Sequence, residues 1–377
     1  MKSFGKSTVS EFLSDQIVFR NLIPFDPRLP GLPELQQKLN FPKNFLPRKA
    51  MPEYGQVLAE IIKASRQASL PNTPLHRIIY IGDTLMNDGQ AFHNICSASG
   101  LGGAAFIGSD RPGPLQIQLN NNGSSVVYTA SRWKALEQFD AFLEESSSIV
   151  DEHAAVLFDL DKTILGARGR NDQVIDMKRL KAAEDTLSEA LGDTFTPEHF
   201  KDAYHALNQV EFHPFTADNQ DYIVYICLIV SSGLIPLADL IFKVRNDKHP
   251  QFQDFIAYVE GRKLSLPVRV RAIHTDVYRR VQSGDPTPFK AFRYNEFKRT
   301  IENMGCLPDS ASIEQILANE IVITGEIREA ANRWKTQGAL LFGLSDKPDE
   351  AILPTRELAA QGNLPVHQTP THVIGEE

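Results

Sequence analysis

The sequence predicts an α/β protein with a mainly parallel central sheet and a large helical insertion. Short apolar runs bounded by charge, Arg77–Ile81 and Ala155–Phe158 among them, are typical of strands buried on both faces. Acidic side chains directly follow both of these runs. Residues 166–315, by contrast, show helical periodicity and many charges. We therefore expect a core made of residues 1–165 and 316–377 and a helical domain made of residues 166–315.

Length and composition allow a sizeable core and exclude some classes of protein. The chain has 377 residues, of which 42% are hydrophobic, so it is long enough for two domains. A formal net charge of −8 provides no basic surface for nucleic acid. The three cysteines are isolated and form neither a zinc pattern nor a disulfide framework, which suits a reducing compartment. We therefore expect a cytoplasmic protein that does not bind nucleic acid.

The N-terminal 47 residues are rich in proline, so we expect an extended arm over the core with one short helix at Pro33–Leu39. A longer helix should begin near Pro52, because proline is favoured in the first turn and the apolar residues that follow share one face. Lys49 lies just before this helix, and Lys43 is the alternative lysine nearby.

Two acidic motifs follow strands of the expected core. Gly82-Asp83-x₄-Asp88 follows the strand at Arg77–Ile81, and Asp159-x-Asp161 ends the strand at Ala155–Phe158. Because ligands of open α/β sheets bind at the carboxyl ends of strands, these acids should share one edge. Burying carboxylates together is costly without a cation, and a hard divalent cation needs several oxygen ligands. Asp159 and Asp161 should face the same side of an extended segment, and we expect the carboxylates of Asp83, Asp88 and Asp159 to converge with the main-chain carbonyl of Asp161.

The segments between these motifs suggest the rest of the sheet. We expect a third strand at Ala104–Gly108, an exposed excursion at Arg111–Ser125, where proline, glycine and asparagine gather, and a further strand at Val126–Thr129. Trp133–Leu143 has helical spacing.

One apolar stretch of the insertion, Tyr222–Ala238, is too short and too polar for a membrane span, which needs about 20 apolar residues. We expect a buried helix that breaks between Gly233 and Pro236, and no contact with a membrane. The stretch suits a homo-oligomer interface as well as the interior of the insertion.

The strand pattern resumes after the insertion. An apolar run ends at Thr324, a helix follows through Trp334, and Gly338 precedes a strand that ends in Ser345-Asp346-Lys347-Pro348. The last residues, 372–377, are also expected to form a strand.

Four of these segments resemble the motifs of the haloacid dehalogenase (HAD) superfamily, most of whose members are Mg²⁺-dependent phosphatases. Asp159-x-Asp161-x-Thr163 resembles the first motif, and Gly82-Asp83-x₄-Asp88 resembles the fourth. The helix, glycine and strand that end at Ser345 resemble the second, and Lys49 supplies the third. The resemblance implies a Rossmann-like, HAD-type core of three layers. It also implies that the helical insertion is a cap, because it follows the first motif.

The resemblance assigns roles to individual residues. Asp159 would attack phosphorus to form an aspartyl-phosphate, and Asp161 would protonate the leaving group and then activate water. Ser345 would bind a phosphoryl oxygen, and Lys49 would add positive charge. Mg²⁺ would be held by Asp83, Asp88, Asp159 and Asp161. Substrate binding would involve Thr163, Arg168, Arg170 and Asp346.

The motif order departs from that of the family. The usual order runs nucleophile, serine or threonine, lysine and acidic loop, whereas this chain runs Lys49, Asp83 with Asp88, Asp159 with Asp161, and Ser345. The same four pieces appear in rotated order, which predicts a circularly permuted core, since permutation preserves a compact domain whose ends lie close together.

Some of these residues also have a structural interpretation. Asp88 suits a helix cap, and Ser345 suits a cap of the helix expected near Pro348. Thr324 competes with Ser345 as the phosphate-binding hydroxyl, because it also follows an apolar run. Arg168 and Arg170 suit surface charges or anchors of a hinge.

The resemblance therefore implies a Mg²⁺-dependent hydrolase that acts on a small phosphorylated metabolite through an aspartyl-phosphate. The first alternative is a phosphotransferase or mutase that uses the same intermediate. The second is a non-catalytic HAD-fold protein that binds a partner.

Overall fold

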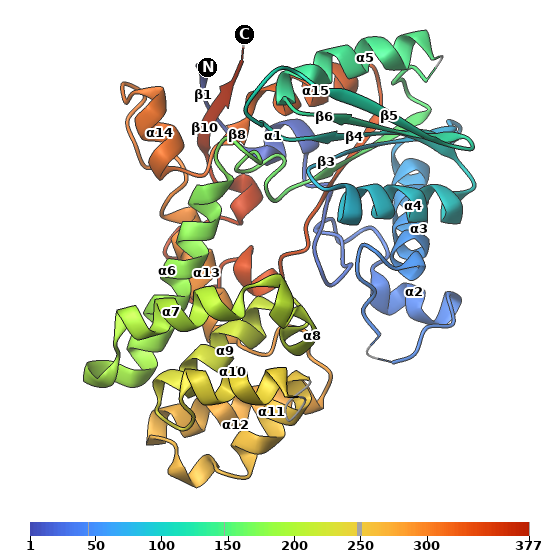
Figure 1. Ribbon diagram of the computed structural model, residues 1–377. Helices are drawn as coiled ribbons and strands as arrows, with labels where there is room; N and C mark the ends of the chain where they lie inside the picture. The colour runs from blue at the N-terminus through green and yellow to red at the C-terminus, as the bar shows by residue number, and fades with distance from the viewer. Residues whose placement is uncertain (44, 147, 247–250, 377) are drawn as a thin grey trace. The chain divides into compact units, whose positions relative to one another are not determined.

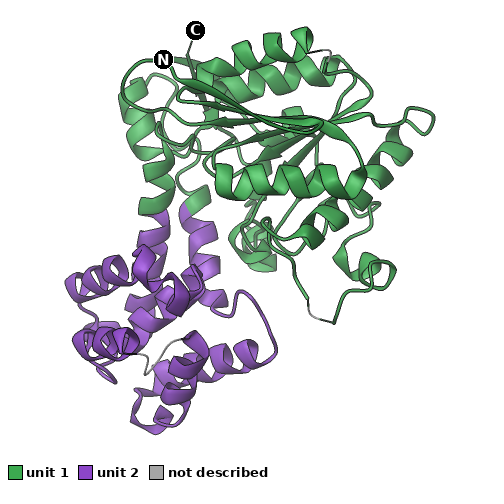
Figure 2. Ribbon diagram, turned by 45° about the vertical axis from the view of Figure 1, so that its right-hand side comes forward, with its two compact units in different colours: residues 1–177, 300–377 green, residues 178–299 purple. Residues whose placement is uncertain are grey.

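The computed structural model describes residues 1–43, 45–146, 148–246 and 251–376 (Figure 1). These residues form two compact units (Figure 2): unit 1 comprises residues 1–177 and 300–377, and unit 2 comprises residues 178–299. The expected insertion, residues 166–315, is longer at both ends than unit 2, because its outermost segments belong to unit 1. A few residues of the expected domains lie outside the described ranges, namely 44, 147, 247–250 and 377. Residue 377 is the end of the expected terminal strand.

Unit 1 is built on a seven-stranded sheet with the order β2-β9-β7-β3-β4-β6-β5. Neighbouring strands are parallel except β5 and β6, which are antiparallel. The strands are β2 (Ile17–Val18), β3 (Arg77–Gly82), β4 (Gly102–Gly108), β5 (Ile117–Asn122), β6 (Ser125–Ala130), β7 (Ala154–Asp159) and β9 (Leu340–Leu344). The protein is thus α/β with a mainly parallel sheet, as predicted, and is consistent with a Rossmann-like core.

Helices cover both faces of this sheet, which explains why its central strands are apolar throughout. β7 is buried at all of its positions. On one face, α3 (Pro52–Ser69) and α4 (Gln90–Ser99) pack against alternate residues of the strands, such as Tyr80 and Leu157. On the other face lie α1 (Val9–Leu13), α5 (Leu136–Glu145) and α15 (Gly325–Thr336) (Figure 1).

The proline-rich N-terminal segment is not the extended arm that we expected. It forms β1 (Lys2–Ser7), α1, β2 and α2 (Leu32–Lys38), and β2 adds an edge strand to the main sheet by pairing with β9. Phe12, Leu13 and Ile17 are fully buried. Burial of these apolar side chains against distant parts of the chain outweighs the local preference of the prolines for irregular backbone.

The predicted excursion at Arg111–Ser125 contains a strand, which corrects the prediction. β5 is an edge strand whose six residues are all exposed, and it pairs with β6 through a hairpin. Leu115, Ile117 and Leu119 do alternate with polar residues, but the proline, glycine and asparagine residues on either side indicated a loop.

A second, three-stranded sheet contains both ends of the described chain. β1 pairs antiparallel with β10 (Thr371–Gly375), and β10 pairs in parallel with β8 (Ile323–Thr324). The predicted strands at Thr324 and at the end of the chain therefore belong to this small sheet rather than to the main one. Lys2 lies opposite Gly375, so the two ends are side by side (Figure 1).

All secondary-structure elements in the described part of unit 2 are helices. Its helices are α7 (Pro197–Leu207), α8 (His213–Thr216), α9 (Gln220–Ser231), α10 (Leu237–Arg245), α11 (Phe252–Glu260) and α12 (Val268–Gln282), while α6 (Asp172–Leu191) and α13 (Lys290–Ile301) cross its boundaries. As predicted, α9 is buried and the chain breaks between Gly233 and Pro236. No helix in the described part of the chain has the length and apolar character of a membrane span.

Candidate functional site

The strands that carry three of the motifs are neighbours in the main sheet. β7, which ends at Asp159, lies between β9 and β3. Ser345 directly follows β9, and Asp83 directly follows β3. Because the three strands are parallel, their carboxyl ends meet at one edge of the sheet, although the motifs lie far apart in the chain.

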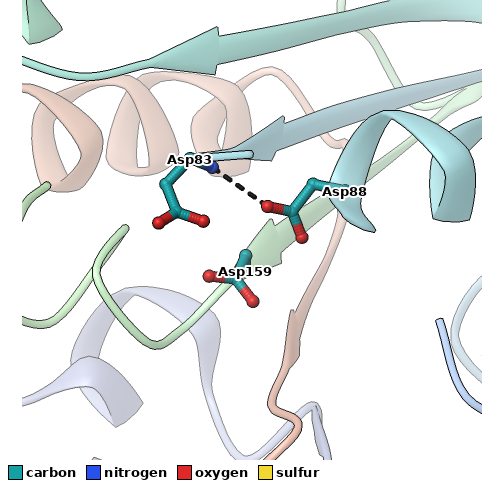
Figure 3. Close-up of side chains that lie close together, drawn as sticks. All are labelled: Asp83, Asp88 and Asp159. Atoms are coloured by element: carbon teal, nitrogen blue, oxygen red, sulfur yellow. Dashed lines mark hydrogen bonds between the residues drawn. The ribbon is translucent and has the colours of Figure 1, made fainter. Parts of the chain in front are cut away.

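Three carboxylates converge at this edge, as the motif positions predict. One oxygen each from Asp83, Asp88 and Asp159 lies within 4.8 Å of the other two, and the three side chains point toward one another (Figure 3). All three side chains are at least nine-tenths buried. The arrangement offers oxygen ligands only, which are the ligands that Mg²⁺ and Ca²⁺ prefer.

Asp88 both joins the cluster and closes the turn after β3. Its Oδ2 accepts hydrogen bonds from the main-chain N–H groups of Asp83, at 3.1 Å, and Thr84, at 3.0 Å. It lies in η1 (Leu85–Gly89), a single helical turn ahead of α4. A Cβ on Gly82 would lie 2.5 Å from the Cβ of Asp88, so glycine is required there for the carboxylate to reach the turn. The helix-cap interpretation is therefore wrong: the N-caps of η1 and α4 are Thr84 and Gly89, neither has a side-chain cap, and the hydrogen bonds of Asp88 close the turn after β3 instead.

Lys49 is the cation at the centre of the cluster. Its Nζ lies 3.1 Å from Asp88 Oδ1 and forms a short hydrogen bond to Asp159 Oδ1. Asp346 Oδ2, on a half-exposed side chain, is 3.7 Å from the same nitrogen. Lys49 is only 4% exposed, whereas the alternative residue, Lys43, is exposed. The structure therefore brings Lys49, and not Lys43, to the carboxylates.

The protonation properties of the cluster reflect an excess of negative charge. Burial raises the pKa of Asp159 well above its ordinary value, Lys49 opposes this, and the neighbouring carboxylates add to it. Burial and the charge of Asp88 raise the pKa of Asp83 to about 7 against the opposing effect of Arg168. For Asp88, burial is outweighed by Lys49 and by hydrogen bonds, which lower its pKa to about 2. The cluster therefore favours the uptake of a proton or another cation.

Asp161 does not point into the cluster, which differs from our expectation that the two acids of the first motif face the same side. The strand ends at Asp159, so the alternation of an extended chain stops before Asp161. The Asp161 carboxylate instead accepts a 2.8 Å hydrogen bond from Ser345 Oγ and lies 3.1 Å from Lys347 Nζ. The main-chain carbonyl of Asp161 remains our predicted metal ligand.

The hydroxyl groups at this edge contact both acids of the first motif. Thr163 is fully buried and donates a 3.0 Å hydrogen bond to Asp159 Oδ2. Ser345 donates to Asp161 and accepts from the main-chain N–H of Lys347, at 3.1 Å. The nearby η6 (Asp349–Ala351) has Pro348 at its N-cap and no side-chain cap, so Ser345 does not cap it.

Thr324, the competitor of Ser345, has a different environment. Its hydroxyl donates to the carbonyl oxygens of Thr163 and Ile164, in the loop that follows Asp159. Thr324 therefore stabilises the loop after Asp159, because its hydroxyl donates to two main-chain carbonyl groups of that loop.

The two arginines after the first motif differ in their contacts. Arg168 Nε forms a short ion pair with Asp83 at the cluster, and its side chain is 36% exposed. Arg170 is 2% exposed and binds Asp110, at 2.8 Å, and Glu326, at 2.9 Å. Arg170 is thus an internal anchor, in line with the structural interpretation, and substrate binding by it would require these ion pairs to open.

Two residues at the site were not selected from the sequence. Lys347 pairs with Asp161, and its signal was its place in the Ser-x-Lys-Pro segment. Tyr80 is buried within β3 and donates a 3.2 Å hydrogen bond to Asp88 Oδ1. Its place in an apolar run hid the contact, because an aromatic ring in a buried strand normally indicates packing only.

Comparison with protein-family models, with curated proteins and with solved structures yields no match for this chain. The resemblance to the HAD superfamily therefore depends on the motif residues themselves and on their meeting at one edge of a parallel sheet.

Proposed function

We propose that the protein is a circularly permuted, HAD-type phosphomonoester hydrolase that uses Mg²⁺ and has unit 2 as its helical cap. The observation that carries the proposal is the convergence of Asp83, Asp88 and Asp159, within 4.8 Å, around the buried Lys49. Three buried carboxylates at the ends of neighbouring parallel strands are costly to the folded state, so a functional reason for them is needed.

The donor set fits Mg²⁺. Its ligands are all oxygens, and the raised pKa values of Asp83 and Asp159 indicate that the cluster lacks one positive charge. Asp83, Asp88, Asp159 and the carbonyl of Asp161 would hold the ion. When bound, Mg²⁺ supplies electrostatic stabilisation of phosphoryl oxygens, which lets an anionic nucleophile approach an anionic substrate.

In the first step, an oxygen of Asp159 attacks phosphorus and the bond from phosphorus to the ester oxygen breaks. Thr163, which donates to Asp159 Oδ2, fixes the orientation of the nucleophile. Lys49 and the hydroxyl of Ser345 bind phosphoryl oxygens and stabilise the charge that they carry. Asp161, in its protonated form, gives its proton to the departing alkoxide.

In the second step, water attacks the phosphorus of the aspartyl-phosphate and releases inorganic phosphate. Asp161, now ionised, takes a proton from the attacking water, and Asp159 is regenerated as a carboxylate. Lys347 holds the Asp161 side chain by a 3.1 Å ion pair, and the Ser345 hydroxyl, which donates to Asp161 at 2.8 Å in the structure, changes acceptor when it binds a phosphoryl oxygen. Asp159 is thus the nucleophile of the first step and the leaving group of the second, whereas Asp161 transfers a proton in both.

The arrangement of the motif strands supports a permuted core. β9, β7 and β3 are adjacent in the sheet although other strands separate them along the chain, β4, β5 and β6 between β3 and β7 and β8 between β7 and β9. The pairing of β1 with β10 brings the two ends of the described chain together, and such a pairing allows a rotated motif order to leave the core intact.

The test is a screen for phosphate release from a panel of phosphorylated metabolites, with Mg²⁺ and with a chelator, for the wild type and for Asp159→Asn. We expect Mg²⁺-dependent release by the wild type, and a loss of about a thousandfold or more in the variant, because the amide cannot act as nucleophile. Asp140→Asn is the matched control, since Asp140 is bound to Arg333 on the surface of α5 and α15.

Two outcomes would overturn the proposal. One is equal turnover by wild type and Asp159→Asn, and the other is an absence of turnover across the panel at every metal condition. Transfer of the phosphoryl group to an added alcohol in excess of phosphate release would indicate a phosphotransferase that uses the same residues.

A further inference from the structure

A cavity of about 440 Å³ in unit 1 borders the carboxylate cluster on one side. Asp83 and Arg168 form the end that faces the cluster, and Arg111 forms part of the lining beyond it. The cavity is large enough for a small metabolite. Since Asp83 belongs to both, a ligand in this cavity can present a phosphoryl group to the cluster.

The floor of the cavity is one face of the sheet at its carboxyl edge. Ile107, Thr129 and Gln118 are direct register partners across β4, β6 and β5, so their side chains lie in a row on the same face. Ser109 and Ser131 directly follow β4 and β6, and both line the cavity. The exposed edge strand β5, which has no evident function in the fold, thus supplies hydrogen-bonding groups to this floor.

Two arginines are linked to each other by the loops that carry them. The main-chain N–H of Asp110 donates to the carbonyl of Arg168 at 2.9 Å, and the main-chain N–H of Arg111 donates to that of Ser131 at 3.2 Å. Gly169 follows Arg168 with a φ of +79°, and a Cβ there would lie 1.9 Å from the carbonyl oxygen of Asp110. The main-chain positions of Arg168 and Arg111 are therefore fixed relative to each other.

Several donors of the cavity have no partner within the part of the chain that the structure describes. Arg111 uses only its Nε, in a 2.9 Å hydrogen bond to Ser109 Oγ, so its terminal nitrogens are free to bind a ligand. The same holds for the side-chain amides of Gln116 and Gln118. A guanidinium group with two free terminal nitrogens matches a carboxylate or a phosphate, which accept two parallel hydrogen bonds.

We propose that this cavity selects phosphate monoesters whose leaving group is hydroxylated and carries a second anionic group, which binds Arg111. The inference rests on the proposed function, because the first phosphoryl group must lie at the cluster. Glutamine, serine and threonine side chains along the floor bind hydroxyl groups, and Arg168 and Arg111 bind one anionic group each. Phosphorylated hydroxy acids and sugar bisphosphates have this chemistry, whereas the esters of simple alcohols do not.

The test compares two matched pairs of compounds in the presence of Mg²⁺. Phosphoglycerate and glycerol phosphate share a three-carbon skeleton and differ in the carboxylate, and fructose bisphosphate and fructose monophosphate differ in the second phosphate. Hydrolysis is measured for the wild type, Arg111→Gln and Arg111→Lys. The control is Arg356→Gln, which removes an exposed arginine of α16 (Arg356–Ala360).

We expect the wild type to prefer the compound with the second anionic group, phosphoglycerate or fructose bisphosphate, in at least one pair. In Arg111→Gln the KM for that member should rise about tenfold, with kcat and the KM of the other member unchanged, because the second anion is bound equally in ground and transition states. Arg111→Lys should recover part of the loss. No preference in either pair, or an equal effect of Arg111→Gln on both members, would overturn the inference.

A binding measurement separates this inference from the proposed function. Isothermal titration of the same four compounds into Asp159→Asn, with and without Arg111→Gln, reports the cavity without any turnover. Preferential binding that depends on Arg111, together with no hydrolysis by the wild type, would keep the cavity and reject the hydrolase. Hydrolysis without any dependence on Arg111 would support the hydrolase and reject the proposed role of the cavity.

Discussion

Two buried ionic clusters, one in each unit, show what distinguishes a candidate site from a structural ion pair. In unit 1, Asp83, Asp88 and Asp159 are opposed by Lys49 and Arg168. In unit 2, Asp221 and Glu296 are opposed by Arg293, which is 5% exposed, and by Arg179, 3.1 Å from Glu296. Both clusters are removed from water, but only the second balances its charges.

The difference appears in what each group binds. Asp221 accepts the main-chain N–H of Phe289 at 3.0 Å as well as the guanidinium of Arg293 at 2.8 Å. Burial lowers the pKa of Arg293, but its two carboxylate partners outweigh burial and raise it overall. In unit 1, by contrast, burial raises the pKa of Asp83 to about 7. A buried charge that is fully paired contributes to the architecture, whereas an excess of buried carboxylates indicates a site for a cation.

The largest expected effect on stability separates the two clusters directly. Asp221→Asn should lower the free energy of unfolding by about 3 to 5 kcal/mol, because it leaves the buried Arg293 without one of its charged partners. Asp159→Asn, measured in a chelator, should leave stability unchanged or raise it, because it removes repulsion from Asp83 and Asp88. Guanidinium unfolding followed by circular dichroism measures both. A loss in Asp159→Asn as large as that in Asp221→Asn would contradict the distinction.

A buried histidine outside both clusters, His367, has one nearby carboxylate but no full pairing of charge, so it lies between the two clusters in this respect. His367 packs against the rings of Phe19 and Phe25 and has Asp15 at 3.5 Å. Burial lowers its pKa from 6.5 to about 4, and Asp15 opposes that shift. The unfolded chain thus binds a proton at higher pH than the folded one, so folding stability is full above pH 6.5 and falls as the pH drops toward about 4.

The expected loss across this window is about 3 kcal/mol, at about 1.4 kcal/mol for each pKa unit. The wild type should show this loss and His367→Phe, whose ring preserves the packing, should not, so the difference between their free energies of unfolding should change by this amount from pH 8 to pH 4. The comparison isolates one buried group that is neutral when folded. Identical pH profiles for the two proteins would show that His367 titrates as in the unfolded chain.

The smallest of the expected effects concerns Mg²⁺ binding by the folded protein. At a free concentration of ten times its dissociation constant, Mg²⁺ should stabilise the wild type by about 1.4 kcal/mol, because it binds the folded cluster and not the unfolded chain. Asp83→Asn should lose this response, whereas Glu137→Gln, on the surface of α5, should keep it. Thermal unfolding with Mg²⁺ or with a chelator measures the shift. An equal shift in Asp83→Asn would place the ion elsewhere.

Most of the sheet could be predicted from local pattern. The strands at β3, β4, β6, β7 and β9 are short apolar runs bounded by charge or glycine, and a run of this kind is compatible with few structures other than a strand covered on both faces. The edge strands β2 and β5 were missed, because the first is two residues long and the second lies among proline, glycine and asparagine residues that favour turns. The pairing of β2 with β9 joins residues distant in sequence, whereas β5 pairs with β6 through a short hairpin.

The site divides in the same way. The sequence determined which acids follow strands, and therefore that Asp83, Asp88 and Asp159 belong to one edge of a parallel sheet. Tertiary structure alone decided that Asp161 turns to Ser345 and Lys347, and that Arg168 binds Asp83 while Arg170, two residues later, is buried between Asp110 and Glu326. The physical reason is that strand formation depends on neighbours along the chain, whereas the partner of a charged side chain depends on loop backbone and on residues that only folding brings near.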